Sequence, residues 1–379
     1  MPCNGTFFVN SPKMTRILDH IIDTDLRETA LKVASGKRIT PDEGILLYER
    51  GDLPVLGLLS SMVRKRINGN YAFYNRNFHI EPTNICIYNC RFCSYRKPAG
   101  DPESWDYSHD EIMNMVRAFD GKNVTEVHIT GGVHPAHDVH YYCSLVAKIK
   151  AHRPELHVKA FSAVELDHMI RLAGLTTEKG LKLLKESGLD SIPGGGAEIF
   201  DEKIRKQISN EKASSEKWLN IHETAHRLGI SSNATMLYGH LETWPHRIDH
   251  MNRLRKLQDK TGGFNAFIPL KYRMANNRMS QLGEVSIIED LRNYAVARIF
   301  LDNIPHIKAY WPMTGKIVAQ LSLFFGADDL DGTIDDTTRI YSMAGAEEQN
   351  PSMTAGEISS LIAGAGYEPV ERDSLYRRV

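Results

Sequence analysis

The sequence has few cysteines, almost no net charge and no long apolar run. Its 379 residues include five cysteines, and 46 Lys and Arg residues nearly balance 47 Asp and Glu residues, for a net charge of −1. So few cysteines exclude a disulfide scaffold, and the balanced charge argues against a strongly basic nucleic-acid-binding protein. No stretch approaches the roughly 18 apolar residues of a transmembrane helix, and the N-terminus lacks the apolar run of a signal peptide. We therefore expect a cytoplasmic protein with no membrane or nucleic-acid partner.

Short β-prone runs alternate with helical stretches along most of the chain, which predicts a parallel sheet joined by helices. Seven runs and an eighth candidate near residues 329–334 suit an α/β fold of the TIM type, a (β/α)₈ barrel. A doubly wound open sheet is the alternative. The runs cover residues 78–80, 126–130, 157–161, 191–192, 234–238, 265–270 and 306–311. Helical stretches between them include residues 108–119, 140–152, 177–187, 214–228, 248–260 and 287–301.

Three regions follow from this rhythm. Residues 1–70 read as a helical N-terminal extension, residues 71–325 as the barrel, and residues 326–379 as a short C-terminal extension that packs on it. Within the first region, Thr40 is a predicted N-cap because Pro41 follows it at the first helical position. In such barrels the chemistry lies where the strands end at their carboxyl side.

The clearest functional signal is a group of three cysteines directly after the first strand. Cys86, Cys90 and Cys93 have the spacing C-x₃-C-x₂-C. Three thiolates on one short loop can hold three corners of a cubane iron–sulfur cluster and leave the fourth iron open, whereas electron-transfer clusters have four cysteines. A structural zinc site would need a fourth ligand, for which the distant Cys143 is a poor candidate. Zinc, or three cysteines without metal, are the alternatives.

Polar residues near the ends of later strands are further candidates for the site. Glu198 follows three consecutive glycines, which allow a ligand to approach the backbone closely. No G-K-[ST] follows those glycines, which argues against a phosphate-binding loop. Glu198 is therefore a candidate catalytic carboxylate, the alternative being a surface acid after a tight turn. Thr235 and Tyr238 could face a ligand from the run at 234–238, although each alone is more often a packing residue.

Two cations, Lys271 and Arg273, follow the run at 265–270 and share one face because side chains alternate along a strand. Cations at a barrel mouth suit an anionic substrate, and the planar fork of arginine grips a carboxylate through two hydrogen bonds. Arg273 is thus a predicted substrate-binding, catalytic residue. The alternative is a pair of solvated loop charges.

The cysteine spacing, with Phe92 as the aromatic residue before the third cysteine, resembles the radical S-adenosylmethionine (SAM) superfamily. The resemblance implies a [4Fe–4S] cluster on Cys86, Cys90 and Cys93, and SAM bound at the open iron. It also implies contacts to SAM from other residues of these loops. These are Tyr88 and Phe92 of the cysteine loop, Gly131 and Gly132 of a glycine-rich loop, Ser162 and Glu165 at the next strand end, and Thr235. For Glu165 the alternative is an acid that complements a helix dipole.

The segments 79–96, 192–200 and 233–242 resemble one subgroup, which makes menaquinone by the futalosine route and includes deazaflavin-precursor synthases. Within it, residues 268–280 favour the branch that joins the adenosyl group of SAM to its substrate over the branch that closes a ring. The resemblance implies a small aromatic dicarboxylate as substrate and an electron donor such as flavodoxin or ferredoxin. A cluster-bearing electron carrier or redox sensor is the alternative outside enzymes, but three ligands and an eight-unit barrel speak against it.

Overall fold

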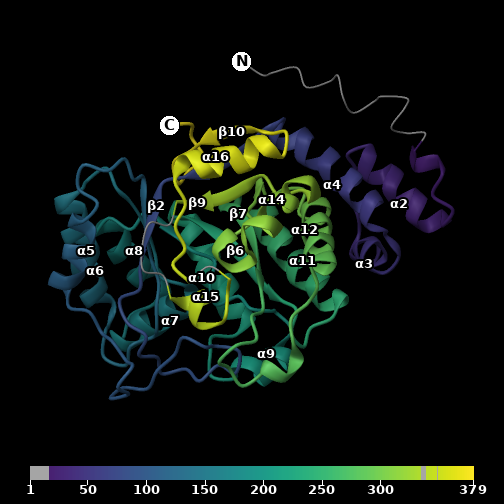
Figure 1. Cartoon of the computed structure of the whole chain (residues 1–379). Coiled ribbons are helices and arrows are strands. Elements are labelled where there is room, and N and C mark those ends of the chain that lie inside the picture. Colours follow the sequence, from purple (N-terminus) through teal and green to yellow (C-terminus); the bar gives the residue numbers. More distant parts are fainter. Residues whose placement is uncertain (1–16, 334–338, 348) are drawn as a thin grey trace.

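The computed structural model describes residues 17–333, 339–347 and 349–379. Its centre is a curled sheet of seven parallel strands in the order β2-β3-β4-β5-β6-β7-β8, with helices on its outer face (Figure 1). Because neighbouring strands follow one another in sequence without a reversal, the sheet has no switch point of the doubly wound kind. The predicted TIM-type α/β barrel is therefore confirmed. Its strands are β2 (Asn77–Ile80), β3 (Glu126–Ile129), β4 (His157–Ala160), β5 (Ser191–Ile192), β6 (Ser231–Tyr238), β7 (Phe264–Lys271) and β8 (His306–Ile307).

A further strand, β9 (Asp329–Gly332), fills the gap between β8 and β2. The Ala309 N–H donates to Asp329 O over 2.8 Å on one side, and the Thr333 hydroxyl donates to Asn77 O over 3.1 Å on the other. The eighth predicted run thus lies between the two edge strands of the curled sheet, although it belongs to a separate three-stranded sheet. Strand β9 also pairs with β1 (Tyr71–Asn75), which pairs in turn with β10 (Glu368–Glu371). The sequence analysis missed β1 and β10, because two short strands from distant parts of the chain leave no local signal.

The helices that cover the barrel begin at polar caps and bury one apolar face each. Helix α5, for example, starts after a capping box at Ser108 and buries Ile112, Met113 and Val116. The covering helices are α5 (His109–Arg117), α6 (Val139–His152), α7 (Ala163–Leu172), α8 (Thr177–Glu186), α9 (Glu202–Ser209), α10 (Ser215–Arg227), α11 (Trp244–Thr261) and α12 (Ile287–Phe300). Shorter turns are η1 (Ser280–Leu282), α13 (Trp311–Thr314), α14 (Lys316–Ser322) and η2 (Leu323–Phe325).

The N-terminal region contributes three described helices, α2 (Thr24–Ala34), α3 (Pro41–Arg50) and α4 (Leu53–Asn68). Thr40 caps α3 through a capping box with Glu43, as its sequence predicts. Helices α3 and α4 pack against α11 and α12 on the outside of the barrel, and α2 packs on α3 and α4 (Figure 1). In the part of the chain that the structure describes, no helix combines the length and apolar character that crossing a bilayer requires.

The C-terminal region reaches both ends of the barrel. Helix α16 (Ala355–Gly364) and β10 lie at one end, and α15 (Ile340–Met343) lies at the other (Figure 1). The backbone N–H groups of Arg339 and Ile340 donate to Glu81, just beyond β2, over 3.0 and 3.2 Å. The segment around α15 is thereby fixed over the carboxyl ends of the strands.

Candidate active site

A cavity of about 280 Å³ opens at the carboxyl ends of the strands and holds the three cysteines. Loops after β2, β3, β5 and β7 line it, and Tyr341 of α15 contributes from the C-terminal region. This is the end of the barrel where catalytic residues assemble. The predicted site residues that line the cavity are Cys86, Tyr88, Cys90, Phe92, Cys93, Gly131, Gly132, Ser162, Glu198, Thr235 and Arg273. Among the described lining residues, Glu165 and Tyr238 are missing.

The cysteine loop is held in place by backbone hydrogen bonds to neighbouring loops. The Cys86 N–H donates to Lys97 O over 3.2 Å, and the Ile87 N–H donates to Val133 O over 3.0 Å. The first bond closes the loop on itself, and the second joins it to the glycine-rich loop after β3. The positions of the three thiols therefore depend on the packing of two loops against each other.

The thiols lie in a small apolar cluster with Tyr88, Phe92, Val133 and Val164. Burial raises the pKa of the Cys86 thiol and raises that of Cys90 to about 12. Backbone N–H groups of Val133 and Tyr88 oppose the shift at Cys86, and so does the Lys212 ammonium. This environment disfavours isolated thiolates but supplies donors for thiolates whose charge a bound metal neutralises.

The number of cysteines fits a cluster better than a single zinc ion. A structural zinc site usually has four protein ligands. Cys143 lies on α6 and does not line the cavity, and Cys3 lies outside the described residues. Three cysteines without a fourth in the described cavity therefore fit a [4Fe–4S] cluster with one open iron, and the zinc alternative loses its support.

The glycine-rich loop after β3 lies flat against the cysteine loop. A Cβ atom at Gly132 would lie 2.3 Å from Ile85 O, and one at Gly131 would lie 2.7 Å from Thr83 O. The Gly132 N–H also donates to Thr83 O over 2.7 Å. Ile85 O and Thr83 O are backbone atoms, which cannot move aside as a flexible side chain could. Each position therefore requires glycine so that the two loops can approach closely.

We expect Gly132→Ala to separate these two loops and to lower the iron content of the reconstituted protein. A methyl group forced against backbone typically costs about 1–3 kcal/mol of folding stability. Iron per chain and thermal unfolding would measure both effects. Gly356→Ala is the matched control, because the nearest atom to its Cβ is Thr354 Oγ1 at 3.9 Å. Normal iron content and stability in Gly132→Ala would show that this close packing is unimportant.

Ser162 and Glu165 form the capping box of α7, and the Glu165 carboxylate faces the glycine-rich loop. It accepts bonds from the Ser162 hydroxyl over 2.6 Å, the Thr130 hydroxyl over 3.0 Å and the Gly131 N–H over 3.2 Å. Burial raises the pKa of Glu165, and these donors oppose the shift. Both carboxylate oxygens are thus occupied within the protein. Ser162 lines the cavity directly, whereas Glu165 acts on it through Gly131.

Glu198 binds a lysine that the sequence analysis missed. Its backbone has a φ of 47°, in the left-handed region, and its carboxylate lies 2.7 Å from Lys212 Nζ. The same ammonium lies 5.1 Å from the centroid of the Phe92 ring. Burial lowers the pKa of Lys212, but the neighbouring Cys90 and Glu198 raise it by more, so the lysine is charged. Lys212 lies between α9 and α10 and belongs to no sequence motif, so nothing in the sequence singled it out. Only the fold brings its charge close to the cysteines.

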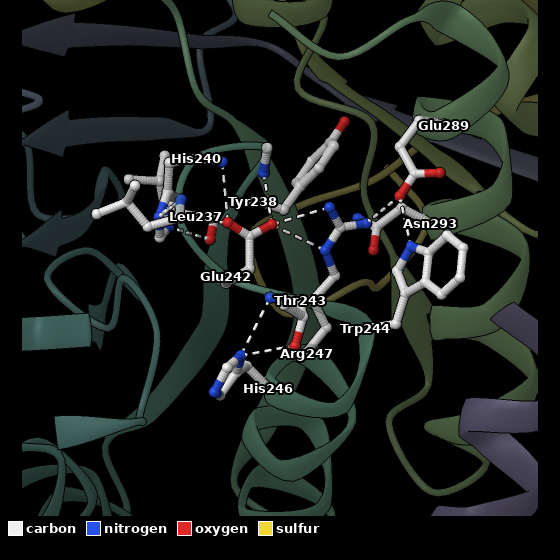
Figure 2. Close-up of polar contacts among 12 residues, drawn as sticks. Leu237, Tyr238, His240, Glu242, Thr243, Trp244, His246, Arg247, Glu289 and Asn293 are labelled. Atoms are coloured by element: carbon white, nitrogen blue, oxygen red, sulfur yellow. Dashed lines mark hydrogen bonds and ion pairs between the residues drawn. The ribbon is translucent and has the colours of Figure 1, made fainter. Parts of the chain in front are cut away.

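Strand β6 presents Thr235 to the cavity and Tyr238 to the opposite face. The Thr235 hydroxyl donates to Gly194 O over 2.6 Å. The Tyr238 hydroxyl donates to Asp290 over 2.8 Å, and its ring lies 5.3 Å from the Arg247 guanidinium. Figure 2 shows Tyr238 beside the polar network in which Arg247 binds Glu242. The structure therefore places Tyr238 in the barrel wall and does not bring it to the other site residues.

Arg273 lines the cavity close to α15. Its guanidinium binds Glu284 over 3.2 Å and Gly345 O over 2.8 Å, while its Nε is buried without a partner among the described residues. Lys271, which also lines the cavity, binds Asp290 over 2.8 Å and Val285 O over 2.9 Å. Lys271 thus uses two of its three donors within the protein, whereas Arg273 keeps a buried Nε–H without a partner among the described residues.

A second polar group, deeper in the barrel, was also missed. Lys159 of β4 lies 2.6 Å from Glu126 of β3, and Lys308 pairs with Asp331 of β9. All four side chains line the cavity, together with His128. Alternation in β3, which turns Glu126 and His128 to the same face, was a signal that could have identified part of this group.

Comparison with known proteins gives matches along most of the chain. Residues 80–254 match the radical SAM superfamily, and residues 261–379 match the CofH/MqnC C-terminal region. The chain is 45% identical over 363 residues to an aminodeoxyfutalosine synthase of Thermus thermophilus, covering 95% of this chain and 97% of that protein. It is 38% identical to a cyclic dehypoxanthine futalosine synthase of Streptomyces coelicolor, covering 94% of this chain and 89% of that protein.

Among solved structures, methylornithine synthase has the same fold, with a TM-score of 0.71 and 16% identity over 90% of this chain and 97% of that chain. The resemblance expected from the cysteine loop is therefore confirmed by both sequence and fold. Because the similarity extends well beyond the cysteine motif, the chain belongs to the radical SAM superfamily of enzymes, within the subgroup of the menaquinone futalosine pathway.

Proposed function

We propose that this enzyme is an aminodeoxyfutalosine synthase. It joins the adenosyl group of SAM to 3-[(1-carboxyvinyl)oxy]benzoate and yields 6-amino-6-deoxyfutalosine and methionine. The observation that carries the proposal is the 45% identity to a protein of that name over 95% of the chain. The cavity supports it, because cationic side chains line both its mouth and its depth, as a substrate with two carboxylates would need.

Cys86, Cys90 and Cys93 would hold the [4Fe–4S] cluster. When bound, the cluster supplies the electron that breaks the sulfonium C–S bond of SAM. The backbone of Gly131 and Gly132 would bind the SAM amino group. Further contacts to SAM would come from residues that line the same cavity, namely Tyr88, Phe92, Ser162 and Thr235.

The adenosyl radical then adds to the terminal carbon of the enolpyruvyl double bond. The aryl group then migrates from oxygen to carbon, which leaves the unpaired electron on that oxygen. The C–C bond to the carboxylate breaks to form the product ketone, the carboxylate leaves as carbon dioxide or, with water, as bicarbonate, and the unpaired electron returns to the donor that began the reaction. Arg273 binds a substrate carboxylate, and Glu198 fixes Lys212 beside the cysteine loop. The enclosing loops exclude water, which protects a radical from side reactions. SAM is consumed as a co-substrate, and a small protein such as flavodoxin or ferredoxin donates the electron.

The second candidate is the ring-closing reaction of the sister enzyme, supported by the 38% identity to a cyclic dehypoxanthine futalosine synthase. An electron carrier is no longer an alternative, because the chain belongs to an enzyme family. The two reactions differ in substrate. The anaerobically reconstituted enzyme, given SAM and a reductant, should consume the benzoate enol ether and leave dehypoxanthine futalosine unchanged. Mass spectrometry would monitor both compounds. Consumption of dehypoxanthine futalosine but not of the benzoate enol ether would favour the cyclase.

A further inference from the structure

The lumen of the barrel has a charged floor below the cysteines. Inward positions of neighbouring strands carry His79 on β2, His128 on β3 and Lys159 on β4, and Lys308 follows β8. All of them line the same cavity as the cysteines. TIM-type barrels ordinarily fill this space with branched apolar side chains, so a group of charges here calls for a ligand or a special structural reason.

Both lysines of the floor have hydrogen-bond donors to spare. The Lys159 side chain is 7% exposed, and its one ion-pair partner in the described chain is Glu126, at 2.6 Å. Lys308 pairs in the same way with Asp331. An ammonium carries three donors, so one acidic partner leaves others free. Burial lowers the pKa of Lys159 and Glu126 opposes that shift, so the carboxylate helps to keep the lysine charged.

Aromatic rings form the wall beside these charges. The His79 and His128 rings meet edge to face at 4.5 Å, and the Tyr310 ring is stacked on His79 at 6.3 Å. His128 Nε2 is buried without a hydrogen-bond partner among the described residues. Burial holds the pKa of His128 well below its usual value, so the ring is neutral and can donate a single proton. The floor therefore offers aromatic surface next to donors that need an acceptor.

The floor lies far enough below the glycine-rich loop to contact an aromatic ring of the substrate rather than SAM. Lys159 is in register with His128, which lies two residues before Thr130. Two residues of a strand span about 6.6 Å, which leaves room for one aromatic ring between the floor and the glycine-rich loop. Arg273, in contrast, lies beyond the end of β7 beside Gly345, at the mouth.

We propose that Lys159 and Lys308 bind the ring carboxylate of an aromatic acid at the floor of the barrel, while Arg273 binds the carboxylate beside the reacting double bond. This inference rests on the proposed function and names the side chains that recognise the substrate of that reaction. A buried anion needs paired donors, and a neutral analogue would leave both lysines without that acceptor. The floor thus selects an aromatic carboxylate over an uncharged ring.

The test compares 3-[(1-carboxyvinyl)oxy]benzoate with its benzamide analogue, which lacks only the ring charge. Binding to the reconstituted enzyme with SAM and without reductant is measured by anaerobic calorimetry. The wild type should bind the acid about 10- to 100-fold more tightly than the amide, in line with a charged hydrogen bond. Lys159→Gln and Lys308→Gln should each reduce this ratio at least several-fold. Arg273→Lys should weaken both ligands equally and leave the ratio unchanged.

Two further variants keep the result interpretable. Glu126→Gln combined with Lys159→Gln removes the ion pair as a unit, so that no buried carboxylate is left alone if the single variant fails to fold. Lys256→Gln, at an exposed lysine of α11, is the control for a lost surface charge. A wild-type ratio near one, or a ratio that survives both lysine changes, would overturn the inference. If the wild type binds and converts neither compound, the proposed function itself fails.

Discussion

Cys86→Ala is expected to abolish both the iron–sulfur cluster and the activity. In the proposed site three thiolates hold the cluster, and no fourth cysteine lines the described cavity to replace a lost one. The broad absorption near roughly 400 nm that such clusters give should disappear after anaerobic reconstitution, and turnover should fall to background. Iron and sulfide content per chain measure the effect directly.

Cys143→Ala is the matched control for that change. Cys143 is half-buried on α6 and does not line the cavity, so its removal should leave cluster content and turnover close to those of the wild type. Cys3→Ala should behave in the same way. An unchanged iron content in Cys86→Ala would refute the assignment of the three cysteines as ligands.

Arg273→Lys is expected to lower kcat/KM by about 10- to 100-fold, or about 1.5–3 kcal/mol, the range for a charged hydrogen bond. Lysine keeps the charge but cannot grip a carboxylate through two parallel bonds. The guanidinium is already oriented by Glu284 and Gly345 O, and its buried Nε has no partner in the described chain. Steady-state kinetics with varied benzoate substrate measure the loss.

Two readouts separate a substrate role of Arg273 from a structural one. Iron content and the slow cleavage of SAM without substrate should be nearly unchanged, because Arg273 belongs to no contact of the cysteine loop that the structure describes. A fall in both would mean that the substitution disturbs the packing of α15 over the mouth. Wild-type kinetics in a folded, fully reconstituted Arg273→Lys protein would refute the substrate role.

The barrel could be predicted, and the candidate cluster ligands could be recognised, because both depend on local patterns. Alternating strands and helices specify a parallel sheet, and the cysteine ligands lie within one short loop. The glycines at 131 and 132 were recognised through the resemblance, and the structure adds the reason, which is contact with the backbone of the cysteine loop.

Residues that depend on strand phase or on distant contacts could not be assigned in the same way. Thr235 and Tyr238 are three positions apart on β6, so they face opposite sides of the sheet, and the sequence did not reveal which one faces inward. Lys212 reaches the cysteines only because the loop after α9 folds back onto Glu198. The lysines of the floor come from β4 and from the segment after β8, which only closure of the barrel brings together.

The proposed function depends most on the fate of the adenosyl group. The most direct test gives the reconstituted enzyme SAM labelled with ¹³C in its adenosine part, together with 3-[(1-carboxyvinyl)oxy]benzoate and a reductant, and follows the label by mass spectrometry. We predict that the label appears in 6-amino-6-deoxyfutalosine, in amounts equal to the methionine released, with little free 5′-deoxyadenosine. Free labelled 5′-deoxyadenosine formed in equal amounts with methionine, and no labelled adduct, would contradict the proposal.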